Sequence, residues 1–245
     1  MAEHSWLAEH AYAHRGLHDA SVPENSLAAF AAALQHGFGI ECDLRASSDG
    51  RAMVFHDADL ERLTGQPGRT ARKSVGELSA MALLGSEEKI PTLRDLLQLV
   101  GGKVPLLLEL KSDRGDNIHK LCRAVRRDLE GYSGHVAAMS FDPRIPAWFA
   151  GRMPDLARGL VITEEGARTL TGSIKRALSV RHARPQFLAY DIRDLPSRFA
   201  GKHARRGLPL LTWTVRSAAH VETARVCDAA PILEGPGVAA WGVAP

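Results

Sequence analysis

The chain has 245 residues, and its 31 lysines and arginines exceed its 28 acidic residues by a formal charge of +3. An apolar fraction of 45% and a charged fraction of 24% are ordinary for globular proteins, and they argue against a disordered, collagen-like or coiled-coil chain. No apolar run approaches the roughly 20 residues that span a bilayer, and the small, dispersed charge does not predict nucleic-acid binding.

The N-terminal segment and the cysteines bear on location. Residues 1–7 lack the basic start and the apolar stretch of a secretory signal, so we expect a cytoplasmic protein. Cys42, Cys122 and Cys227 are far apart and predict neither a zinc site nor a disulfide framework. We therefore expect no nucleic-acid partner and no stable membrane association. The sequence predicts no particular oligomeric state.

Short apolar runs alternate with amphipathic segments along the first half of the chain. In order, the expected elements are strand 11–14, helix 26–36, strand 39–45, apolar run 51–57, helix 91–100, strand 104–111 and helix 117–129. Gly37 follows the first of these helices and Pro91 begins the second, as is typical of helix ends.

The same alternation continues in the second half. The expected elements are strand 135–141, a helix near 146–151, strand 157–162, a helix near 173–182, strand 187–191, helix 196–206, strand 209–215, helix 218–227 and strand 231–234. Strands that alternate with helices predict a parallel sheet built from βαβ units.

The run 51–57 is the exception to this alternation. Residues 47–50 are too few to hold a crossover helix, so the run is expected to return antiparallel to strand 39–45. We assign it to an insertion of about residues 46–89. Eight strands remain, which predicts a (β/α)8 barrel in one domain of residues 1–245. The rival fold is an open doubly wound sheet, but no glycine-rich phosphate loop follows the first strand.

Acidic side chains alternate with apolar ones on two of the expected strands. Glu41 and Asp43 share one face, and Glu109 and Lys111 share a face farther along the chain. Three carboxylates that meet at the end of a barrel would suit a hard divalent cation, Mg²⁺ or Ca²⁺. The alternative is internal salt bridging, such as Glu109 with Lys111 or Arg15 with Asp43, and spacing alone leaves both open.

Two histidines end apolar runs. His14 precedes Arg15 and Gly16 at the end of the first strand, which is the end where barrel enzymes keep their chemistry. His56 precedes Asp57, which could orient its ring or merely cap the next turn. Histidines beside a cation could act as general acid and base for displacement at phosphorus, although a lone histidine is more often structural.

Several other residues have two readings. Asn25 or Ser26 fits an N-cap of the first helix at least as well as a ligand contact. Trp213 and Phe141 lie on or at the end of strands, where core packing and the lining of a ligand pocket are both open.

The motifs together resemble the glycerophosphodiester phosphodiesterase family over nearly the whole chain. They are HRG at 14–16, PENS at 23–26, ECDLRASSDG at 41–50, VFHDADLERLTG at 54–65, IPTL at 90–93, LLLELKS at 106–112, SFD at 140–142 and WTV at 213–215. The resemblance implies a (β/α)8 barrel with a small insertion after the second strand. It also implies hydrolysis of glycerophosphodiesters to glycerol 3-phosphate and an alcohol with Ca²⁺ or Mg²⁺.

The resemblance also implies residue roles. Glu41, Asp43 and Glu109 would be the metal ligands, and His14 and His56 the acid–base pair. The substrate would be bound by Arg15, Lys111 and Trp213. Members of the family often carry Thr-Asp at the end of the last strand, where this chain has Glu234, so the rim of the pocket there is a departure.

Three rival functions stay open from the sequence. A lysophospholipase D or sphingomyelinase D-like enzyme would share the barrel and the site. Another metal-dependent barrel enzyme, such as a sugar isomerase, is a second possibility. A catalytically silent barrel that binds phosphodiesters or a protein partner is a third. The sequence predicts neither the preferred alcohol nor the choice between the two cations.

Overall fold

Strands and helices alternate along the chain as the sequence predicts. The computed structural model describes residues 4–113 and 115–242, and β1, β2 and β4–β9 are the eight strands of a (β/α)8 barrel fold. The chain divides into unit 1, residues 1–14 and 137–245, and unit 2, residues 15–136. The ends of the expected single domain of residues 1–245 lie outside the described residues, so that domain assignment stays a prediction.

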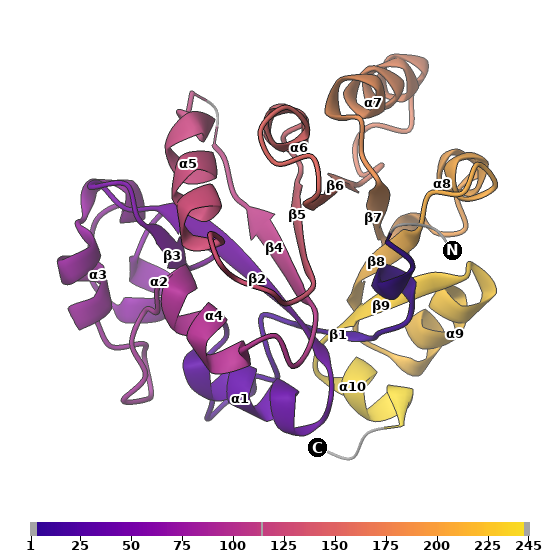
Figure 1. The fold of residues 1–245 in the computed structure, drawn as a ribbon. Coiled ribbons are helices and arrows are strands. Elements are labelled where there is room, and N and C mark those ends of the chain that lie inside the picture. The colour runs from indigo at the N-terminus through magenta and orange to yellow at the C-terminus, as the bar shows by residue number, and fades with distance from the viewer. Residues whose placement is uncertain (1–3, 114, 243–245) are drawn as a thin grey trace. The chain divides into compact units, whose positions relative to one another are not determined.

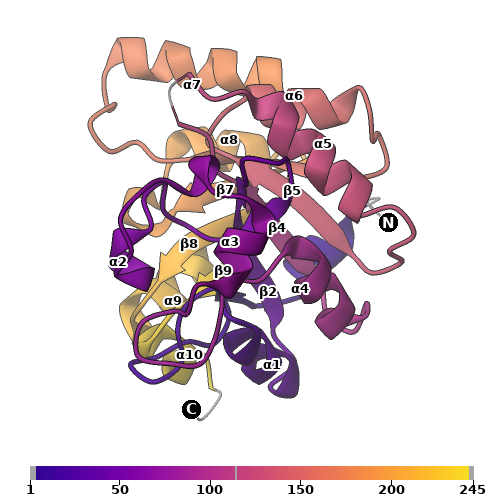
Figure 2. The ribbon, with the colours of Figure 1, turned by 90° about the vertical axis from the view of Figure 1, so that its left-hand side faces the viewer.

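Unit 2 holds the second and third barrel strands and the insertion. Its elements are α1 (Leu27–Gln35), β2 (Gly39–Ala46), β3 (Ala52–Val54), α2 (Glu61–Thr64), η2 (Thr70–Arg72), α3 (Val75–Ala80), α4 (Leu93–Val100), β4 (Leu106–Leu110) and α5 (Ile118–Asp128). Strands β2 and β4 pair in parallel, and β3 returns antiparallel to β2. The antiparallel return expected for residues 51–57 is therefore confirmed. Figure 2 shows the insertion from the side on which α2 and α3 face the viewer.

Polar caps fix where the helices of unit 2 begin. The side chain of Ser26 accepts a hydrogen bond from the N–H of Ala29 and starts α1. Thr92 and Asp95 form a reciprocal capping box at the start of α4. Within the insertion, buried apolar side chains make a separate cluster; they are Met53, Phe55, Leu60, Leu78, Leu83 and Ile90. The insertion thus has its own small core, which holds residues 55–57 in place.

Unit 1 holds the first strand and the last five. Its strands are β1 (Tyr12–His14), β5 (Val136–Ser140, which begins at the unit boundary), β6 (Ala157–Ile162), β7 (Phe187–Asp191), β8 (Leu210–Val215) and β9 (Ala229–Leu233). Its helices are η1 (Ser5–Ala8), α6 (Arg144–Ala150), α7 (Leu170–Ala183), η3 (Ile192–Asp194), α8 (Arg198–Ala204), α9 (Ala218–Val226) and α10 (Pro236–Trp241). Figure 1 shows α7, α8 and α9 outside strands β6 to β9.

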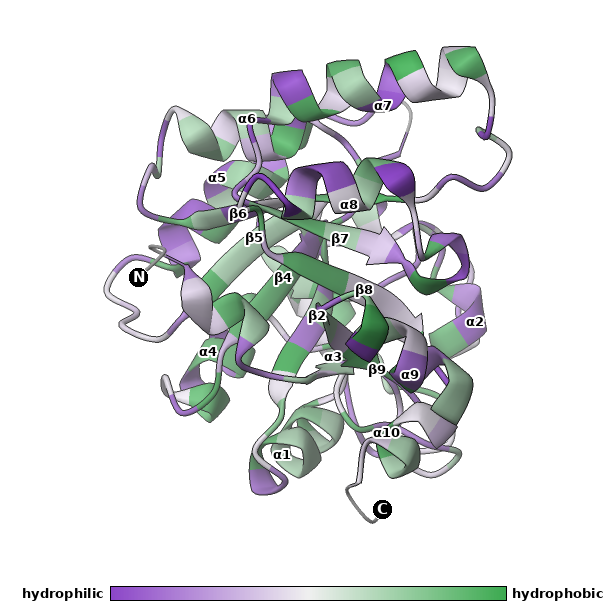
Figure 3. Cartoon of the chain, turned by 90° about the vertical axis from the view of Figure 1, so that its right-hand side faces the viewer, coloured by the Kyte–Doolittle hydropathy of each residue, from purple (hydrophilic) through white to green (hydrophobic). Residues whose placement is uncertain are grey.

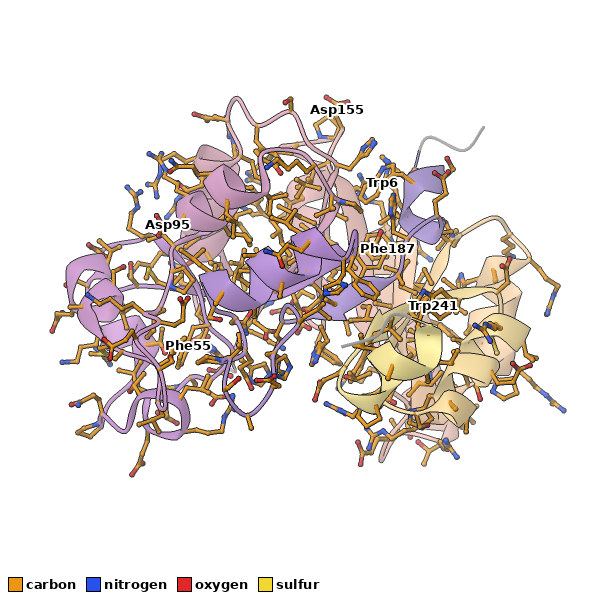
Figure 4. The ribbon with its side chains drawn as sticks, turned by 90° about the horizontal axis from the view of Figure 1, so that it is seen from below. Trp6, Phe55, Asp95, Asp155, Phe187 and Trp241 are labelled. Carbon is orange, nitrogen blue, oxygen red and sulfur yellow. The ribbon has the colours of Figure 1, made fainter. Side chains whose placement is uncertain are left out.

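The strands of unit 1 pair in parallel in the order β5–β6–β7–β8–β9–β1. Buried apolar residues of β6, β7 and β8 pack under α7 and α8, and these strand segments are hydrophobic in Figure 3. In Figure 4, Trp241 lies on α10, where the guanidinium of Arg225 from α9 stacks 5.2 Å from the ring centroid. The parallel pairing aligns the carboxyl ends of the strands at one end of the unit.

Helix ends in unit 1 differ from the sequence-based expectation where a hydroxyl caps a turn. Helix α7 begins at Leu170 rather than near residue 173, because Thr169 accepts a hydrogen bond from the N–H of Gly172. Helix α8 begins at Arg198, two residues later than expected, because Ser197 is its N-cap. Across residues 4–113 and 115–242, no helix combines the length and the apolar character that crossing a bilayer demands.

Candidate active site

The register of two neighbouring strands brings the acidic residues of unit 2 together. Asp43 on β2 lies directly beside Glu109 on β4, and Glu41 precedes Asp43 by one pleat on the same face. On the other face, Ile40, Cys42 and Leu44 are fully buried. The alternation in the sequence therefore predicts the correct face for the carboxylates.

The three carboxylates are withdrawn from solvent. Glu41, Asp43 and Glu109 are 1%, 0% and 7% exposed, and oxygens from all three lie within 4.8 Å of one another. Burial raises the pKa of Glu41 well above its usual value, and the charges of Asp43 and Glu109 raise it further. The charged form of Glu41 is therefore disfavoured unless further positive charge is placed beside the three carboxylates.

Two cations of unit 2 contact this cluster. The Nε of Arg15 lies 2.9 Å from Oδ2 of Asp43, and the Nζ of Lys111 lies 2.9 Å from Oδ1 of Asp43. Lys111 also donates to Glu109 at 2.6 Å. Both salt bridges weighed from the sequence, Arg15 with Asp43 and Lys111 with Glu109, are thus present. Burial works to lower the pKa of Lys111, but Asp43 and Glu109 outweigh it and raise that pKa.

The charge of the cluster tests whether a metal ion fits. If all three carboxylates were ionised, the two cations would leave one negative charge in a buried space, and this cost is why the pKa of Glu41 is raised. A divalent cation would turn this into one positive charge, the complement of a phosphodiester anion. The oxygen donors are those that Mg²⁺ and Ca²⁺ prefer. Salt bridging and metal binding are therefore compatible, and this acidic group could hold a divalent ion.

The loop after β1 places Arg15 beside the carboxylates. The backbone N–H of Arg15 donates to Oε2 of Glu41 at 3.1 Å. Gly16 has φ +80°, and a Cβ there would lie 2.7 Å from the carbonyl carbon of Ala29 in α1. Only glycine fits this turn without displacing α1. The HRG motif is thus explained by the guanidinium and by the space at the glycine.

Asn25 holds the central carboxylate from a second side. Its side chain donates to Oδ2 of Asp43 at 3.0 Å, and it accepts from the backbone N–H of Asp43 at 3.2 Å. Ser26, rather than Asn25, is the N-cap of α1. The N-cap is therefore Ser26, and a ligand contact of Asn25 stays a prediction.

A chain of polar contacts links His56 to the cluster. Nδ1 of His56 lies 2.6 Å from Oδ1 of Asp57, which accepts from Nε of Arg62 at 2.5 Å through its other oxygen. Arg62 binds Glu24 at 2.8 and 3.0 Å, and Glu24 accepts from Arg15 at 2.7 Å. The orienting role considered for Asp57 is confirmed by this contact. With Nδ1 engaged, Nε2 is the nitrogen left for proton transfer.

The backbone around His56 is held by the same strand that carries Asp43. The N–H of Phe55 donates to the carbonyl of Asp43 at 2.9 Å, and Nε of Arg45 donates to the carbonyl of His56 at 2.7 Å. Burial lowers the pKa of His56, as do the charges of Lys111 and Arg15, while Asp43 opposes this. The ring is therefore neutral at neutral pH.

Within unit 1, His14 has a carboxylate partner at the corresponding nitrogen. Its Nδ1 lies 2.5 Å from Oε2 of Glu234, and Arg216 donates twice to Glu234, at 2.8 and 3.1 Å. The register explains this contact, because Ala13 on β1 pairs with Leu233 on β9. Burial works to raise the pKa of Glu234, but the hydrogen bonds of His14 and Arg216 outweigh it and lower that pKa.

Two aromatic side chains of unit 1 contact each other, Trp213 on β8 and Phe141 directly after β5. The rings of Trp213 and Phe141 meet edge to face, with centroids 5.4 Å apart. The indole Nε1 of Trp213 donates to the carbonyl of Ala189 at 3.1 Å, which fixes the ring. Phe141 is 45% exposed. The pair is thus a partly open apolar surface rather than sealed core.

Unit 2 brings together six of the eight predicted site residues: Arg15, Glu41, Asp43, His56, Glu109 and Lys111. His14 and Trp213 belong to unit 1. Their roles, like the roles of the other six, remain predictions.

The sequence analysis did not assign three of the residues that hold the site. In the sequence, Glu234 stands out only as a departure from a family pattern. Its position one residue after β9 could have indicated a carboxylate at the carboxyl end of that strand. Glu24 and Arg62 lie inside the PENS and VFHDADLERLTG motifs, yet their pairing joins stretches 38 residues apart. Spacing carries no information about such a pair.

The chain resembles curated glycerophosphodiester phosphodiesterases over part of its length. It is 37% identical over 108 residues to the glycerophosphodiester phosphodiesterase of Caldanaerobacter subterraneus subsp. tengcongensis, a match that covers 41% of this chain and 44% of the relative. It is 30% identical over 128 residues to human glycerophosphodiester phosphodiesterase 1, covering 48% of this chain and 37% of the relative. The chain thus spans less than half of these relatives' lengths.

Solved structures with the same fold cover almost the whole chain. An Oleispira antarctica phosphodiesterase in complex with its product sn-glycerol-3-phosphate matches with a TM-score of 0.82 and 21% identity, over 95% of each chain. The glycerophosphodiester phosphodiesterase of Thermotoga maritima matches with a TM-score of 0.72 and 24% identity, over 91% of this chain and 93% of the other. At these identities the likeness establishes the fold.

Family membership rests on the longest sequence match. The profile of the glycerophosphoryl diester phosphodiesterase family matches residues 14–233, which runs from the first candidate histidine to the end of β9. The chain belongs to the glycerophosphoryl diester phosphodiesterase family.

Proposed function

We propose that the protein hydrolyses glycerophosphodiesters to glycerol 3-phosphate and an alcohol in a reaction that requires a divalent metal. The observation that carries this proposal is the buried cluster of Glu41, Asp43 and Glu109 with Arg15 and Lys111 against it. Family membership supports the reaction class. The likeness to the Oleispira antarctica phosphodiesterase, which was solved with sn-glycerol-3-phosphate, supports the product.

Glu41, Asp43 and Glu109 would hold the metal ion. A bound Mg²⁺ or Ca²⁺ would supply Lewis-acid stabilisation of charge on the phosphate oxygens. Asn25 keeps Asp43 in place through hydrogen bonds on both of its sides, and the backbone N–H of Arg15 keeps Glu41 in place. These contacts give the ligands fixed positions before an ion binds.

Arg15 and Lys111 would bind the phosphate. Both are already ordered by carboxylates, so little side-chain freedom is lost when substrate enters. Arg15 also donates to Glu24, which Arg62 holds from the other side. Trp213 would line the glycerol side of the pocket with Phe141 beside it.

His56 would act as the general base and His14 as the general acid. Nε2 of His56 takes a proton from water, or from the hydroxyl of the substrate that neighbours the phosphate, as the new oxygen–phosphorus bond forms. His14 gives a proton to the alcohol oxygen as its bond to phosphorus breaks. The neutral ring of His56 supports its role as base. The contact of Glu234 with Nδ1 supports the role of His14, because it orients the ring with Nε2 as the other nitrogen.

The partner is thus a small glycerophosphodiester. A location in the cytoplasm is part of this proposal.

A substrate panel tests the proposal. Glycerophosphocholine, glycerophosphoethanolamine, glycerophosphoglycerol and glycerophosphoinositol would each be incubated with the protein in EDTA, in Mg²⁺ and in Ca²⁺. Release of glycerol 3-phosphate is followed with a coupled glycerol 3-phosphate dehydrogenase. We expect turnover of at least one substrate with metal and none in EDTA.

Two results would contradict the proposal in different ways. Full activity in EDTA would refute the metal requirement. Binding of the substrates without turnover in either saturating metal would instead indicate a catalytically silent phosphodiester-binding barrel.

A further inference from the structure

Helix α7 of unit 1 exposes large apolar side chains to solvent. Leu170, Ile174 and Leu178 are 80%, 51% and 61% exposed. Their spacing of four residues places them in one stripe along the helix, about 12 Å long at 1.5 Å per residue. Figure 3 shows α7 with hydrophobic bands among hydrophilic ones on its outer side.

The exposed stripe is not needed to hold α7 on the sheet. The helix packs through Val180 and Ala183 against the buried cluster of β6, β7 and β8. A surface helix usually turns its apolar side to the core and its polar side to water. Here a second apolar side faces outward, and a contiguous exposed stripe of this kind marks an interaction surface.

The charged residues of the helical segment itself have one sign, although Asp194 and Glu164 pair with Arg168 and Arg176 near its start. Residues 168–184 contain five cations, Arg168, Lys175, Arg176, Arg181 and Arg184, and no carboxylate. Lys175 and Arg181 are exposed on α7, and neither forms an ion pair with any residue in the described parts of the chain. Arg181 follows Leu178 on the side of the helix that carries the stripe, and Lys175 lies at its flank. Apolar and basic groups therefore share one outward surface.

We propose that α7 is an interfacial helix that docks the protein reversibly on an anionic lipid surface. Leu170, Ile174 and Leu178 would enter the boundary between headgroups and acyl chains, and the cations beside them would contact lipid phosphates. A basic helix with an outward apolar face is the pattern of helices that lie in the membrane interface. Lipid headgroups of negative charge attract basic segments within about a Debye length.

The charge also decides between this surface and a second copy of the chain. An isologous contact through α7 would bring two such basic segments together, and like charges would oppose it. Nucleic acid offers phosphates but no site for exposed leucine and isoleucine, and α7 carries no Phe, Tyr or Trp ring for stacking. An anionic lipid surface satisfies both the apolar and the basic side chains.

A neighbouring cavity of about 720 Å³ does not provide an alternative docking site for anions. It lies between the start of α7 and the segment of η3 and α8. Several of its cations already have carboxylate partners, since Arg168 pairs with Asp194 at 2.8 Å and Arg193 with Asp191 at 2.6 Å. Lys175 and Arg181 form no such ion pair with any described residue, so they remain available to lipid phosphates.

Flotation of the full chain with lipid vesicles tests the proposal. Vesicles of phosphatidylcholine alone would be compared with vesicles that also contain phosphatidylserine, at low and at high ionic strength. We expect binding to the anionic vesicles that high salt weakens. The charge variant Lys175→Ser/Arg181→Ser should bind them roughly 30-fold less tightly, from about fivefold per charge. The apolar variant Leu170→Ser/Ile174→Ser/Leu178→Ser should also lose binding.

Control variants outside α7 test whether a change in net charge or in exposed apolar surface alone would reduce binding. Arg123→Ser/Arg126→Ser removes two exposed charges from α5, and Leu84→Ser/Val226→Ser removes two exposed apolar side chains. Both should bind vesicles like the unchanged protein. All variants should keep the turnover of soluble substrate, because none touches the proposed active site. Binding is measured without turnover, so its outcome is separate from that of the proposed reaction.

Three results would overturn the proposal. They are absence of binding to anionic vesicles at low salt, equal loss of binding in the control variants, and self-association of the unchanged protein that the apolar α7 variant abolishes. The last result, read by sedimentation velocity, would assign the stripe to a contact between copies instead.

Discussion

Each candidate catalytic histidine has a carboxylate at Nδ1. Asp57 holds His56 at 2.6 Å, and Glu234 holds His14 at 2.5 Å. Arginines hold both carboxylates in turn, Arg62 for Asp57 and Arg216 for Glu234. Each ring therefore has a fixed orientation, and the proposed mechanism assigns proton transfer to Nε2. The same arrangement, a histidine whose Nδ1 contacts a carboxylate that an arginine binds, therefore occurs twice in the chain.

Removal of either ring should slow turnover without unfolding the protein. We expect His14→Ala and His56→Ala each to lower kcat by roughly 10²–10⁴-fold, the usual contribution of acid–base catalysis. His119→Ala is the matched control, since His119 is an exposed histidine on α5 without an assigned role. Circular dichroism checks that the fold is intact. A double variant of His14 and His56 with undiminished kcat would refute the assignment.

The acid side of the pH profile reports the state of His56. As base it must be neutral, and burial lowers its pKa below the ordinary value of 6.5. Falling pH protonates the ring only once it passes that lowered pKa, so the acid limb of kcat/KM should lie below pH 6.5. Asp57→Asn removes a partner that raises this pKa, and the limb should then move to still lower pH. A limb that moves to higher pH would contradict the assignment.

Glu234 should act on the reaction through His14. Glu234→Gln keeps the shape of the side chain but removes its charge. A hydrogen bond to a charged group contributes about 1.5–3 kcal/mol, so we expect kcat to fall roughly 10- to 100-fold. KM should change little, because the oxygens of Glu234 are already engaged by His14 and Arg216. A rise in KM at constant kcat would show instead that the residue shapes the pocket.

At the scale of the elements, strand parity predicts the acidic cluster because a pleated strand leaves only two faces. Alternation in residues 40–44 assigns Glu41 and Asp43 to one face, and the pairing of Asp43 with Glu109 places the third carboxylate. Helix ends are predicted less well, as at α7, because a single hydroxyl such as that of Thr169 decides them.

Contacts between distant side chains are the part that the sequence does not predict. The links from Arg62 to Glu24 and from His14 to Glu234 depend on how the elements pack. Local periodicity determines which face a residue occupies, but it does not specify the partner that a long side chain reaches across that face. The family resemblance names the eight candidate residues and not the carboxylates and arginines that orient them.

The turn at Gly16 offers a test of how the start of unit 2 packs against α1. Gly16→Ala should be more destabilising than Gly37→Ala, although both glycines have positive φ, +80° and +70°. A Cβ at Gly37 meets nothing within 4 Å, so that variant costs only about 1–2 kcal/mol of backbone strain. At Gly16 the collision with Ala29 adds about 1–3 kcal/mol. Chemical denaturation measures both, and equal losses of stability would contradict the steric explanation.

At the scale of the whole molecule, eight predicted strands and the antiparallel return after β2 identify the fold. The count of eight barrel strands depends on one inference, that residues 47–50 are too few to form a crossover helix. The antiparallel pairing of β3 with β2 confirms this inference. Neither composition nor charge distinguishes a barrel from an open sheet. Strand order does, because β5 to β9 follow one another in chain order, whereas a doubly wound sheet reverses its order at a switch point.

Metal binding should couple to the stability of the whole molecule. Without an ion, Glu41, Asp43 and Glu109 repel one another in a buried space, which destabilises the folded state. An ion that binds only the folded chain adds about 2.7 kcal/mol when it is present at a hundredfold excess over its Kd. For a chain of this size we expect Tm to rise by roughly 5–10 °C on addition of Mg²⁺ or Ca²⁺.

Glu41→Gln separates repulsion from ligation in the same measurement. In EDTA the variant should melt no lower than the unchanged protein, because it loses a buried like charge while keeping the packing of the side chain. With metal present the order should reverse, since the variant lacks one charged ligand. Differential scanning fluorimetry in EDTA, Mg²⁺ and Ca²⁺ shows whether the two melting curves cross. If both proteins respond equally to metal, the ion binds elsewhere and the carboxylates serve only as salt-bridge partners of Arg15 and Lys111.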